Sequence, residues 1–236
     1  MTALVVIPAR GGSKGIPRKN LLPVGGRPLI TWTITQALAA RRALEDVLVV
    51  VSTEDTEIAS VSRAAGARVI DRPAHLAEDT TPTEPVILHA MDVVEAEGEV
   101  LDAVVLLQAT SPVRREDTVR RAIESFRSGP ADALIGVVPE SPFFWRLPER
   151  PGVGAVPAYD PMARPRRQDL EPEQMHYFEN GSLYVTAPQI YREQENRIGG
   201  LVELFVLDEA EGTDIDTVAD VAAAESMLTH LGWRLP

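Results

Sequence analysis

The 236-residue sequence contains no cysteine, which excludes a disulfide framework and a thiolate metal site. It also has no apolar run near the ~20 residues that a membrane-spanning helix requires. The apolar run at the N-terminus, about six residues long, is too short for the core of a signal peptide and has no basic lead-in. We therefore expect a cytoplasmic protein that does not contact membranes.

Positive charge is in short supply. The chain has 23 Lys and Arg against 35 Asp and Glu, a net charge of -12. So acidic a balance argues against binding to nucleic acid or to anionic membranes. With 44% hydrophobic residues, the chain is globular and long enough for a large core. We predict a single domain over residues 1–236 with an inserted arm at about 139–180.

Lysine is the scarcest basic residue: of the 23, two are lysines, Lys14 and Lys19. Both fall in residues 10–19, where two arginines and three glycines also lie, after an apolar run at residues 3–8. A strand followed by a glycine-rich loop and a helix is a phosphate-binding layout, and the basic residues would supply countercharge. The spacing fits neither GxGxxG nor GxxxxGK[ST], so a basic surface turn is the alternative.

Apolar runs alternate with helical patterns over the first 138 residues. The patterns predict strands at 3–8, 47–52, 67–71, 102–108 and 132–138, and helices at 28–42, 53–66, 84–98 and 115–129. Continuous apolar strands separated by helices indicate an α/β doubly wound, mostly parallel sheet. The pattern breaks in the Pro-, Arg- and aromatic-rich arm. It resumes with strands at 181–186 and 201–207 and a helix at 216–232.

Residues 7–20, IPARGGSKGIPRKN, closely resemble the signature of the acylneuraminate cytidylyltransferase family, the CMP-sialic acid synthetases. Further stretches resemble that family in the same order: residues 72–83, 106–114 (LLQATSPVR, with Ala109 where proline is usual), 164–169, 177–184 and 214–225. The resemblance implies a Rossmann-like nucleotide-diphospho-sugar transferase fold, a homodimer, CTP, Mg²⁺ and a nonulosonic acid acceptor. The acceptor's hydroxyl would attack the α-phosphorus of CTP, and pyrophosphate would leave.

The resemblance also assigns roles to residues. The catalytic set is Arg10, Lys19, Gln108 and Asp216. The CTP-binding set is Arg10, Gly11, Gly12, Ser13, Lys14, Lys19, Asn20, Arg72, Thr81, Thr83 and Gln108. The acceptor side comprises Gln108 and Tyr184, and the metal pair is Asp214 and Asp216.

The residues themselves support some of these roles. In the sequence DID, both carboxylates can point the same way, and Mg²⁺ takes one or two protein carboxylates beside phosphates. The alternative is that Asp216 caps a helix starting at Thr217. An acidic sugar needs a cation, and Arg164, Arg166 and Arg167 could bind its carboxylate bidentately. The alternative for these three is a solvated basic face.

The acceptor half departs from the family pattern. Phe144 or Trp145 stands near a place where a basic residue is usual, and Phe178 stands where some relatives carry Arg. The acceptor could therefore be a deaminated, di-amino or deoxy nonulosonate (KDN, legionaminate, pseudaminate), KDO or a phosphonate. Use of another nucleotide, or a catalytically silent nucleotide-binding protein, are further alternatives. The apolar clusters at 142–145 and 175–178 predict a homodimer contact.

Overall fold

A mostly parallel sheet of seven strands organises the described part of the chain. The computed structural model describes residues 1–13, 15–150 and 152–232. The strands are β1 (Thr2–Pro8), β4 (Val47–Thr53), β5 (Arg68–Asp71), β6 (Leu101–Leu107), β7 (Ala133–Glu140), β10 (His176–Thr186) and β11 (Val202–Val206). Their order is β11-β7-β10-β6-β1-β4-β5. β10 runs antiparallel to both β6 and β7, and the other pairings are parallel.

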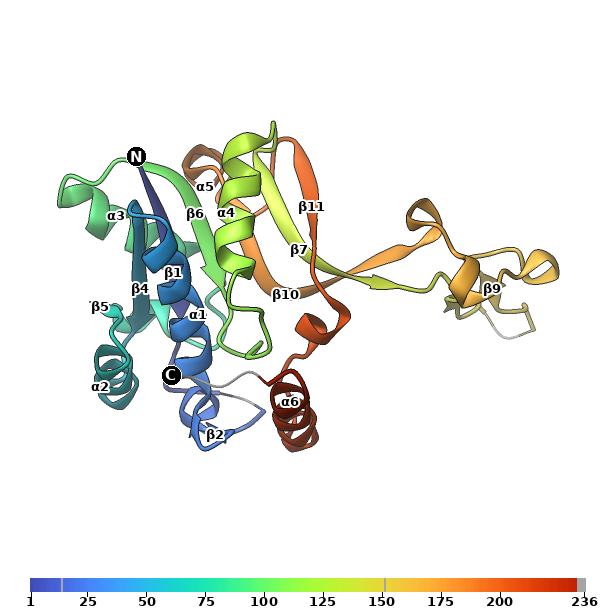
Figure 1. Cartoon of the computed structure of the whole chain (residues 1–236), viewed down its shortest axis with the longest axis horizontal. Helices are drawn as coiled ribbons and strands as arrows, with labels where there is room; N and C mark the ends of the chain where they lie inside the picture. Colours follow the sequence, from blue (N-terminus) through green and yellow to red (C-terminus); the bar gives the residue numbers. More distant parts are fainter. Residues whose placement is uncertain (14, 151, 233–236) are drawn as a thin grey trace.

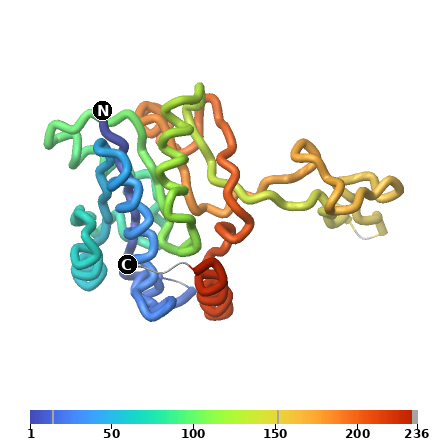
Figure 2. The backbone as a smooth tube through the Cα atoms, viewed as in Figure 1, coloured from blue at the N-terminus to red at the C-terminus, as the bar shows by residue number. Residues whose placement is uncertain are grey.

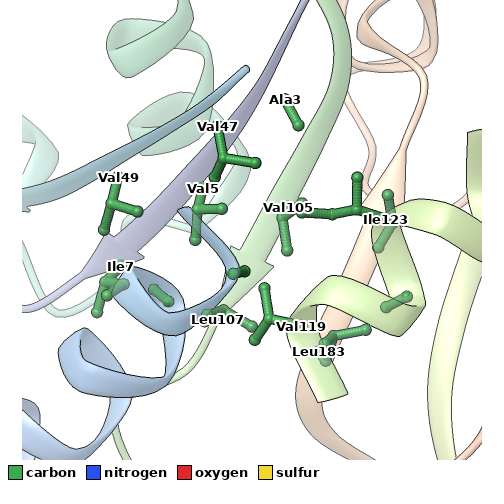
Figure 3. Packing of buried hydrophobic residues seen from close by; sticks show 14 of the residues in the cluster. Ala3, Val5, Ile7, Val47, Val49, Val105, Leu107, Val119, Ile123 and Leu183 are labelled. Carbon is green, nitrogen blue, oxygen red and sulfur yellow. The ribbon is translucent and has the colours of Figure 1, made fainter. Parts of the chain in front are cut away.

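Helices cover both faces of this sheet (Figure 1). One face carries α1 (Leu29–Ala43), α2 (Thr56–Ala64) and α4 (Thr118–Ser128), and the other carries α3 (Glu84–Ala96) and α5 (Pro188–Gln194). In β1, Val5 and Ile7 pack toward the first face (Figure 3), and Leu4 and Val6 toward the second. Because successive strand side chains alternate, an unbroken apolar strand is buried on both sides. The doubly wound prediction is confirmed.

A third, smaller apolar cluster anchors the C-terminal helix α6 (Val218–His230). It joins α6 to Trp32 of α1 and to a short hairpin, β2 (Pro23–Val24) with β3 (Arg27–Pro28). Ile215, just before α6, is fully buried there. The cluster therefore holds the DID segment against the N-terminal loop.

Several element boundaries differ from the sequence predictions. β10 begins at His176, five residues before the strand predicted at 181–186, because it pairs with β7 out along the arm. α2 begins after Asp55, not Thr53, because the Asp55 carboxylate accepts the backbone N–H groups of Glu57 and Ile58. α4 begins three residues later than predicted, since the chain before it stays in an irregular loop. The short α5 and the β2–β3 hairpin were not anticipated, because neither is long enough to show a periodic pattern.

The arm begins where the sequence pattern breaks. β7 and β10 leave the sheet together as a two-stranded ribbon whose last paired residues are Glu140 and His176. Beyond them the chain is largely irregular, with a small pair of strands, β8 (Trp145–Arg146) and β9 (Val156–Pro157). Figures 1 and 2 show this arm projecting far from the body of the molecule.

Candidate functional site

The candidate site lies at the carboxyl ends of the parallel strands. β1, β4, β5 and β6 end at the same edge of the sheet, and the loops that follow them carry Arg10, Glu54, Arg72 and Gln108. A cleft of about 440 Å³ opens at this edge. Open α/β sheets bind ligands in such a crevice. The predicted site residues that line it are Arg10, Gly12, Ser13, Lys19, Asn20, Arg72, Thr81, Thr83, Gln108 and Asp216.

Two cations of the glycine-rich loop face this cleft. Arg10 Nη1 lies 2.8 Å from Asp79 Oδ1 and donates to the Glu78 carbonyl at 3.2 Å. Lys19 Nζ donates to the Ile215 carbonyl at 2.7 Å and lies 3.0 Å from Asp216 Oδ1. Both cations are therefore held at the rim of the cleft by acceptors on other segments. Lys14 was assigned to the same site and lies outside the described residues.

Asn20 has a structural hydrogen bond as well as a place in the cleft. Its Nδ2 donates to the Arg10 carbonyl at 3.0 Å. This hydrogen bond joins the two ends of the glycine-rich loop, next to Arg10 and Lys19. Asn20 thus fixes the backbone of the residue that carries one of the cleft cations.

Arg18 and Gly11 are engaged with acidic residues beside the cleft rather than lining it. Arg18, at a left-handed φ of 59°, pairs with Asp55 and Glu57 after β4. The Gly11 N–H donates to Glu54 Oε1 at 2.7 Å, and a Cβ on Gly11 would lie 2.5 Å from Asp55 Oδ2. A side chain at position 11 would collide with Asp55, so the position requires glycine. The Gly11 N–H is already hydrogen-bonded to Glu54. Of the basic residues described in this loop, Arg10 and Lys19 line the cleft, whereas Arg18 anchors the loop to the segment after β4.

Arg72 is a buried cation in the wall of the cleft. Its Nε donates to Ser52 Oγ at 3.2 Å and its Nη2 to the Ser52 carbonyl at 2.5 Å, while Nη1 lies 3.9 Å from Glu54 Oε2. Burial lowers the pKa of the Arg72 guanidinium, and the charge of Glu54 opposes that shift. With two nitrogens anchored on β4, the guanidinium is fixed in orientation. Of its three nitrogens, Nη1 is the one without a hydrogen bond to Ser52.

The two threonines assigned to the nucleotide lie in the loop between β5 and α3. Thr81 Oγ1 donates to the His75 carbonyl at 3.0 Å. The Thr83 carbonyl accepts the N–H groups of Val86 and Ile87 in the first turn of α3. These bonds fix both ends of the loop whose Glu78 and Asp79 contact Arg10.

The two carboxylates of the DID segment flank the buried Ile215, and of the two, Asp216 lines the cleft. Asp214 Oδ1 accepts a hydrogen bond from Ser111 Oγ at 3.2 Å. The N-cap of α6 is Thr217, and Asp220 accepts the N–H groups of both Asp216 and Thr217. The alternative in which Asp216 caps the helix is therefore wrong. Two hard carboxylates on one extended segment suit Mg²⁺, which takes one or two protein carboxylates.

Gln108 ends β6 beside a bulge in β10. Glu179 pairs with Val137, whereas Tyr184 pairs with Ile135, so three extra residues bulge from β10 between them. The Gln108 N–H donates to the Ser182 carbonyl at 3.3 Å. Gly181 has a φ of 75°, and a Cβ there would lie 3.5 Å from the Gln108 amide nitrogen. The bulge at residues 180–183 thus packs against Gln108.

The assigned tyrosine lies behind the cleft rather than in its lining. Tyr184 is buried, and its hydroxyl donates to Glu179 Oε1 at 2.5 Å. Burial raises the pKa of this hydroxyl, and the hydrogen bond to Glu179 acts in the same direction. The guanidinium carbon of Arg197 lies 5.3 Å from its ring centroid, and Arg197 Nε lies 2.6 Å from Glu84 Oε1. Tyr184 therefore contacts Glu179 and Arg197 in this structure.

The three arm arginines are separated from the cleft within one chain. Arg164 stacks on Phe143 with its guanidinium carbon 4.2 Å from the ring centroid. Arg166 Nε lies 2.6 Å from Asp169 Oδ2. Arg167 lines a second hollow of about 530 Å³ at the root of the arm, together with Phe178. The structure does not bring these arginines to the residues that line the first cleft.

One buried residue at this edge had no role in the sequence predictions. Arg114 is in the stretch that resembles the family, yet its burial and its partners on α1 and β10 depend on the tertiary fold. No local sequence spacing identifies a buried arginine of this kind. The nearest indication is that a charged residue ends a segment made of an apolar strand and a turn.

In residues 1–13, 15–150 and 152–232, no helix is long and apolar enough to cross a membrane.

Known proteins resemble this chain over nearly all of its length. A family model described as Cytidylyltransferase matches residues 4–146. The chain is 33% identical over 235 residues to CMP-N,N'-diacetyllegionaminic acid synthase of Legionella pneumophila, covering 97% of each protein. It is 30% identical over 227 residues to pseudaminic acid cytidylyltransferase of Campylobacter jejuni, covering 95% of each. It is 32% identical to N-acylneuraminate cytidylyltransferase A of Danio rerio and spans about half, 52%, of that longer protein.

Solved structures agree on the fold. A CMP:2-keto-3-deoxy-manno-octonic acid synthetase superposes with a TM-score of 0.68 at 18% identity, covering 98% of this chain and 100% of that one. A 4-diphosphocytidyl-2C-methyl-D-erythritol synthase superposes with a TM-score of 0.64 at 16% identity, covering 96% and 99%. With the family match, and with the cleft at the carboxyl ends of β1 and β6, the sequence resemblance is confirmed. The chain belongs to the cytidylyltransferase family and is a nucleotidyltransferase.

Proposed function

We propose that the protein is a Mg²⁺-dependent cytidylyltransferase that transfers CMP from CTP to a nonulosonic, sialic-type acid in the cytoplasm. One observation carries the proposal: Arg10 and Lys19 of the glycine-rich loop line a single cleft together with Arg72, Gln108 and Asp216 from three other segments. The three relatives described above, named for legionaminic, pseudaminic and N-acylneuraminic acids, favour an acceptor of that class.

The nucleotide would lie between the basic loop and the loop after β5. Arg10, Ser13 and Lys19 would bind the triphosphate, because phosphate oxygens are strong acceptors for cationic donors. Arg72 would donate to the cytosine through Nη1, since its other nitrogens are engaged with Ser52. Thr81 would lie beside the base. The ribose hydroxyls would face Asn20 and Thr83.

Asp214 and Asp216 would hold Mg²⁺ together with phosphate oxygens. The bound ion would neutralise charge on the phosphates and help align the in-line attack. Lys19 already neutralises Asp216 and stands at the position where phosphate and carboxylate oxygens would meet. Its ammonium, a compact point charge on a flexible stem, could move from the carboxylate to a phosphate oxygen.

In the transfer step, the acceptor hydroxyl oxygen forms a bond to the α-phosphorus. The bond from the α-phosphorus to the bridging oxygen breaks, and pyrophosphate leaves with that oxygen. The hydroxyl proton passes to solvent. Arg10 and Lys19 stabilise the charge that develops on the leaving group, and Gln108 lies between nucleotide and acceptor, where it orients the attacking group.

The acceptor's carboxylate would be bound by an arm from a second copy of the chain. The arm carries Arg164, Arg166 and Arg167 away from its own cleft and exposes large apolar groups: Phe144 (48% exposed), Trp145 (54%) and Met162 (93%). Soluble monomers rarely leave such a patch in water. A homodimer with two-fold symmetry would bury both arms equally. Arg164, Arg166, Arg167 and Tyr184 are proposed to form the acceptor side of that composite site.

The test is pyrophosphate release with each of four nucleoside triphosphates against a panel of nonulosonic acids, KDO and a phosphonate. We expect release with CTP, dependent on Mg²⁺ and on one class of acid. Turnover with another nucleotide alone would reassign the base, and turnover with KDO or the phosphonate alone would reassign the acceptor. Stabilisation by CTP without release for any acceptor would favour a silent nucleotide-binding protein.

A further inference from the structure

Arg114 is a buried cation directly beneath the Gln108 turn, with 2% of its surface exposed. A guanidinium has five N–H groups, and here each has an acceptor. Nη1 donates to Thr33 Oγ1 at 3.1 Å and to Gln36 Oε1 at 3.0 Å, both on α1. Nε donates to Ser182 Oγ at 2.8 Å. Nη2 donates to the carbonyls of Gln108 at 2.8 Å and Ser182 at 2.7 Å.

The Nη2 contacts identify what Arg114 holds together. One nitrogen bridges two backbone carbonyls, one at the end of β6 and one in the bulge of β10. Gly181, next to Ser182, lies against the Gln108 amide. The Arg114 guanidinium therefore ties the Gln108 backbone to the bulge, beside the Gln108 side chain.

The turn at residues 108–114 is also hydrogen-bonded to α1 beside the Arg114 side chain. Gln36, which accepts from Arg114, donates through Nε2 to the Pro112 carbonyl at 2.7 Å and the Arg114 carbonyl at 3.3 Å. Thr33 and Gln36 are buried polar residues on the core side of α1, and their contacts with Arg114 and the turn explain why they are there. The turn is thus fixed to the helix as well as to the sheet.

This arrangement is costly for stability alone. The five acceptors are neutral oxygens, and burial lowers the pKa of Arg114 to about 10, with the charges of Glu211 and Asp214 opposing the shift. The group still stays charged at neutral pH. A well-packed apolar side chain often serves stability as well as a buried charge does. The Arg114 guanidinium is hydrogen-bonded at once to α1, to the end of β6 and to the bulge of β10. An apolar side chain could pack there, but it could not fix the relative positions of these three segments through hydrogen bonds.

We infer that Arg114 is a positioning residue for the transfer step, acting through Gln108 and the bulge at residues 180–183 on the acceptor side of the cleft. The inference rests on the proposed function. Arg10, Lys19 and Arg72 lie on other loops and have no contact with this guanidinium. Loss of the guanidinium should therefore impair turnover while leaving nucleotide binding intact.

The first experiment compares Arg114→Lys with Arg115→Lys. Arg115 is the adjacent residue, and its exposed side chain pairs with Asp208. We expect Arg114→Lys to lower kcat by about tenfold or more, as misplacement of a substrate-positioning group does. The rise in melting temperature caused by CTP and Mg²⁺ should match wild type. Arg115→Lys should leave both quantities unchanged. An unchanged kcat in Arg114→Lys would overturn the inference.

A double-mutant cycle separates positioning from general destabilisation. If Arg114 acts through Gln108, Arg114→Lys should add little loss of kcat in a Gln108→Ala background. If the fold-loss of kcat in the double variant equals the product of the losses in the two single variants, Arg114 does not act through Gln108. If Arg114→Lys does not fold, Ser182→Ala, which removes one of the five acceptors, takes its place in the same cycle.

Hydrogen exchange makes the inference testable apart from the proposed function. In Arg114→Lys, or in Ser182→Ala if the lysine variant does not fold, amides of residues 180–183 should exchange faster than in wild type. Amides of β1 should be unaffected. Equal exchange in the bulge would overturn the inference even if the enzyme is active. A wild-type protein with no turnover of any acceptor would instead contradict the proposed function, and the exchange result would still decide whether Arg114 holds the bulge.

Discussion

Lys19 Nζ lies 3.0 Å from Asp216 Oδ1, although 197 residues separate the two in sequence. The contact joins the glycine-rich loop to the DID segment. Gly15 is part of the same junction, since a Cβ there would lie 3.0 Å from the Asp216 carbonyl oxygen. The proposed phosphate-binding cation and the proposed metal ligand are therefore neighbours before any ligand arrives.

The shape of the Lys19 cation should be essential. Lys19→Arg keeps the charge, but its planar fork is wider than an ammonium that fits between the Ile215 carbonyl and Asp216. We expect at least a tenfold loss of kcat, about 1.4 kcal/mol. Arg41→Lys, on the exposed side of α1, should be silent in the same pyrophosphate assay. Equal tolerance at both positions would contradict the role of the compact ammonium.

Removing a proposed metal ligand should impair catalysis more than folding. Asp216→Asn and Asp214→Asn should each reduce turnover by about two orders of magnitude or more, because each removes a charge that would help hold Mg²⁺ beside the phosphates. Circular dichroism and melting temperature should stay close to wild type for Asp216→Asn, whose side chain is exposed. Full activity of this variant at saturating Mg²⁺ would argue against a metal-binding role.

The nucleotide preference should be visible without catalysis. With Mg²⁺ present, CTP should raise the melting temperature more than ATP, GTP or UTP, since a ligand that binds the native state stabilises it by mass action. Arg72→Ala should reduce that advantage, because the anchored guanidinium would be lost. A larger shift with GTP than with CTP would mean that the base is assigned incorrectly.

Asp55 should stabilise the fold in a pH-dependent way. The hydrogen bond from Arg18 is the main cause that lowers the pKa of Asp55, and the α2 N–H groups add to it. Its contribution is therefore complete above the ordinary Asp pKa of about 3.9 and is lost as pH falls through the lower folded-state value. Asp55→Ala should cost about 1–2 kcal/mol at neutral pH. Urea unfolding should show that this difference begins to shrink as pH falls below about 3.9 and continues to shrink as the carboxyl becomes protonated in the folded state as well; a constant difference would disprove the linkage.

The arm should mediate dimerisation. A double change of Phe144→Ser with Trp145→Ser should shift the protein toward monomer in sedimentation experiments and lower activity with it. Leu231→Ser, an apolar-to-polar change at the end of α6 and far from the arm, is the matched control and should leave the oligomeric state unchanged. A wild-type protein that is monomeric at micromolar concentration and fully active would refute the dimer.

Local patterns were sufficient for the sheet and for much of the cleft. The strands around β1 are apolar throughout, which is what burial on both faces requires, and the loops after parallel strands meet at one edge by geometry. Arg10 and Gln108 could therefore be placed together from the sequence. The partners of Arg114 could not, because Thr33 and Ser182 are 81 and 68 residues away from it. The same is true of Arg18, whose pairing with Asp55 depends on how the two loops pack.

In the residues that the structure describes, the arm leaves the body through one pair of strands. Its entry and exit strands, β7 and β10, are hydrogen-bonded neighbours out to the Glu140–His176 pair, so both ends of the arm start from adjacent positions. Closing an inserted loop of a different length across such a pair changes the closure entropy slowly, by roughly 0.6 kcal/mol for each doubling of length. Under the proposed function, a change in the length or sequence of the arm would alter acceptor binding and leave the residues that line the nucleotide cleft in place.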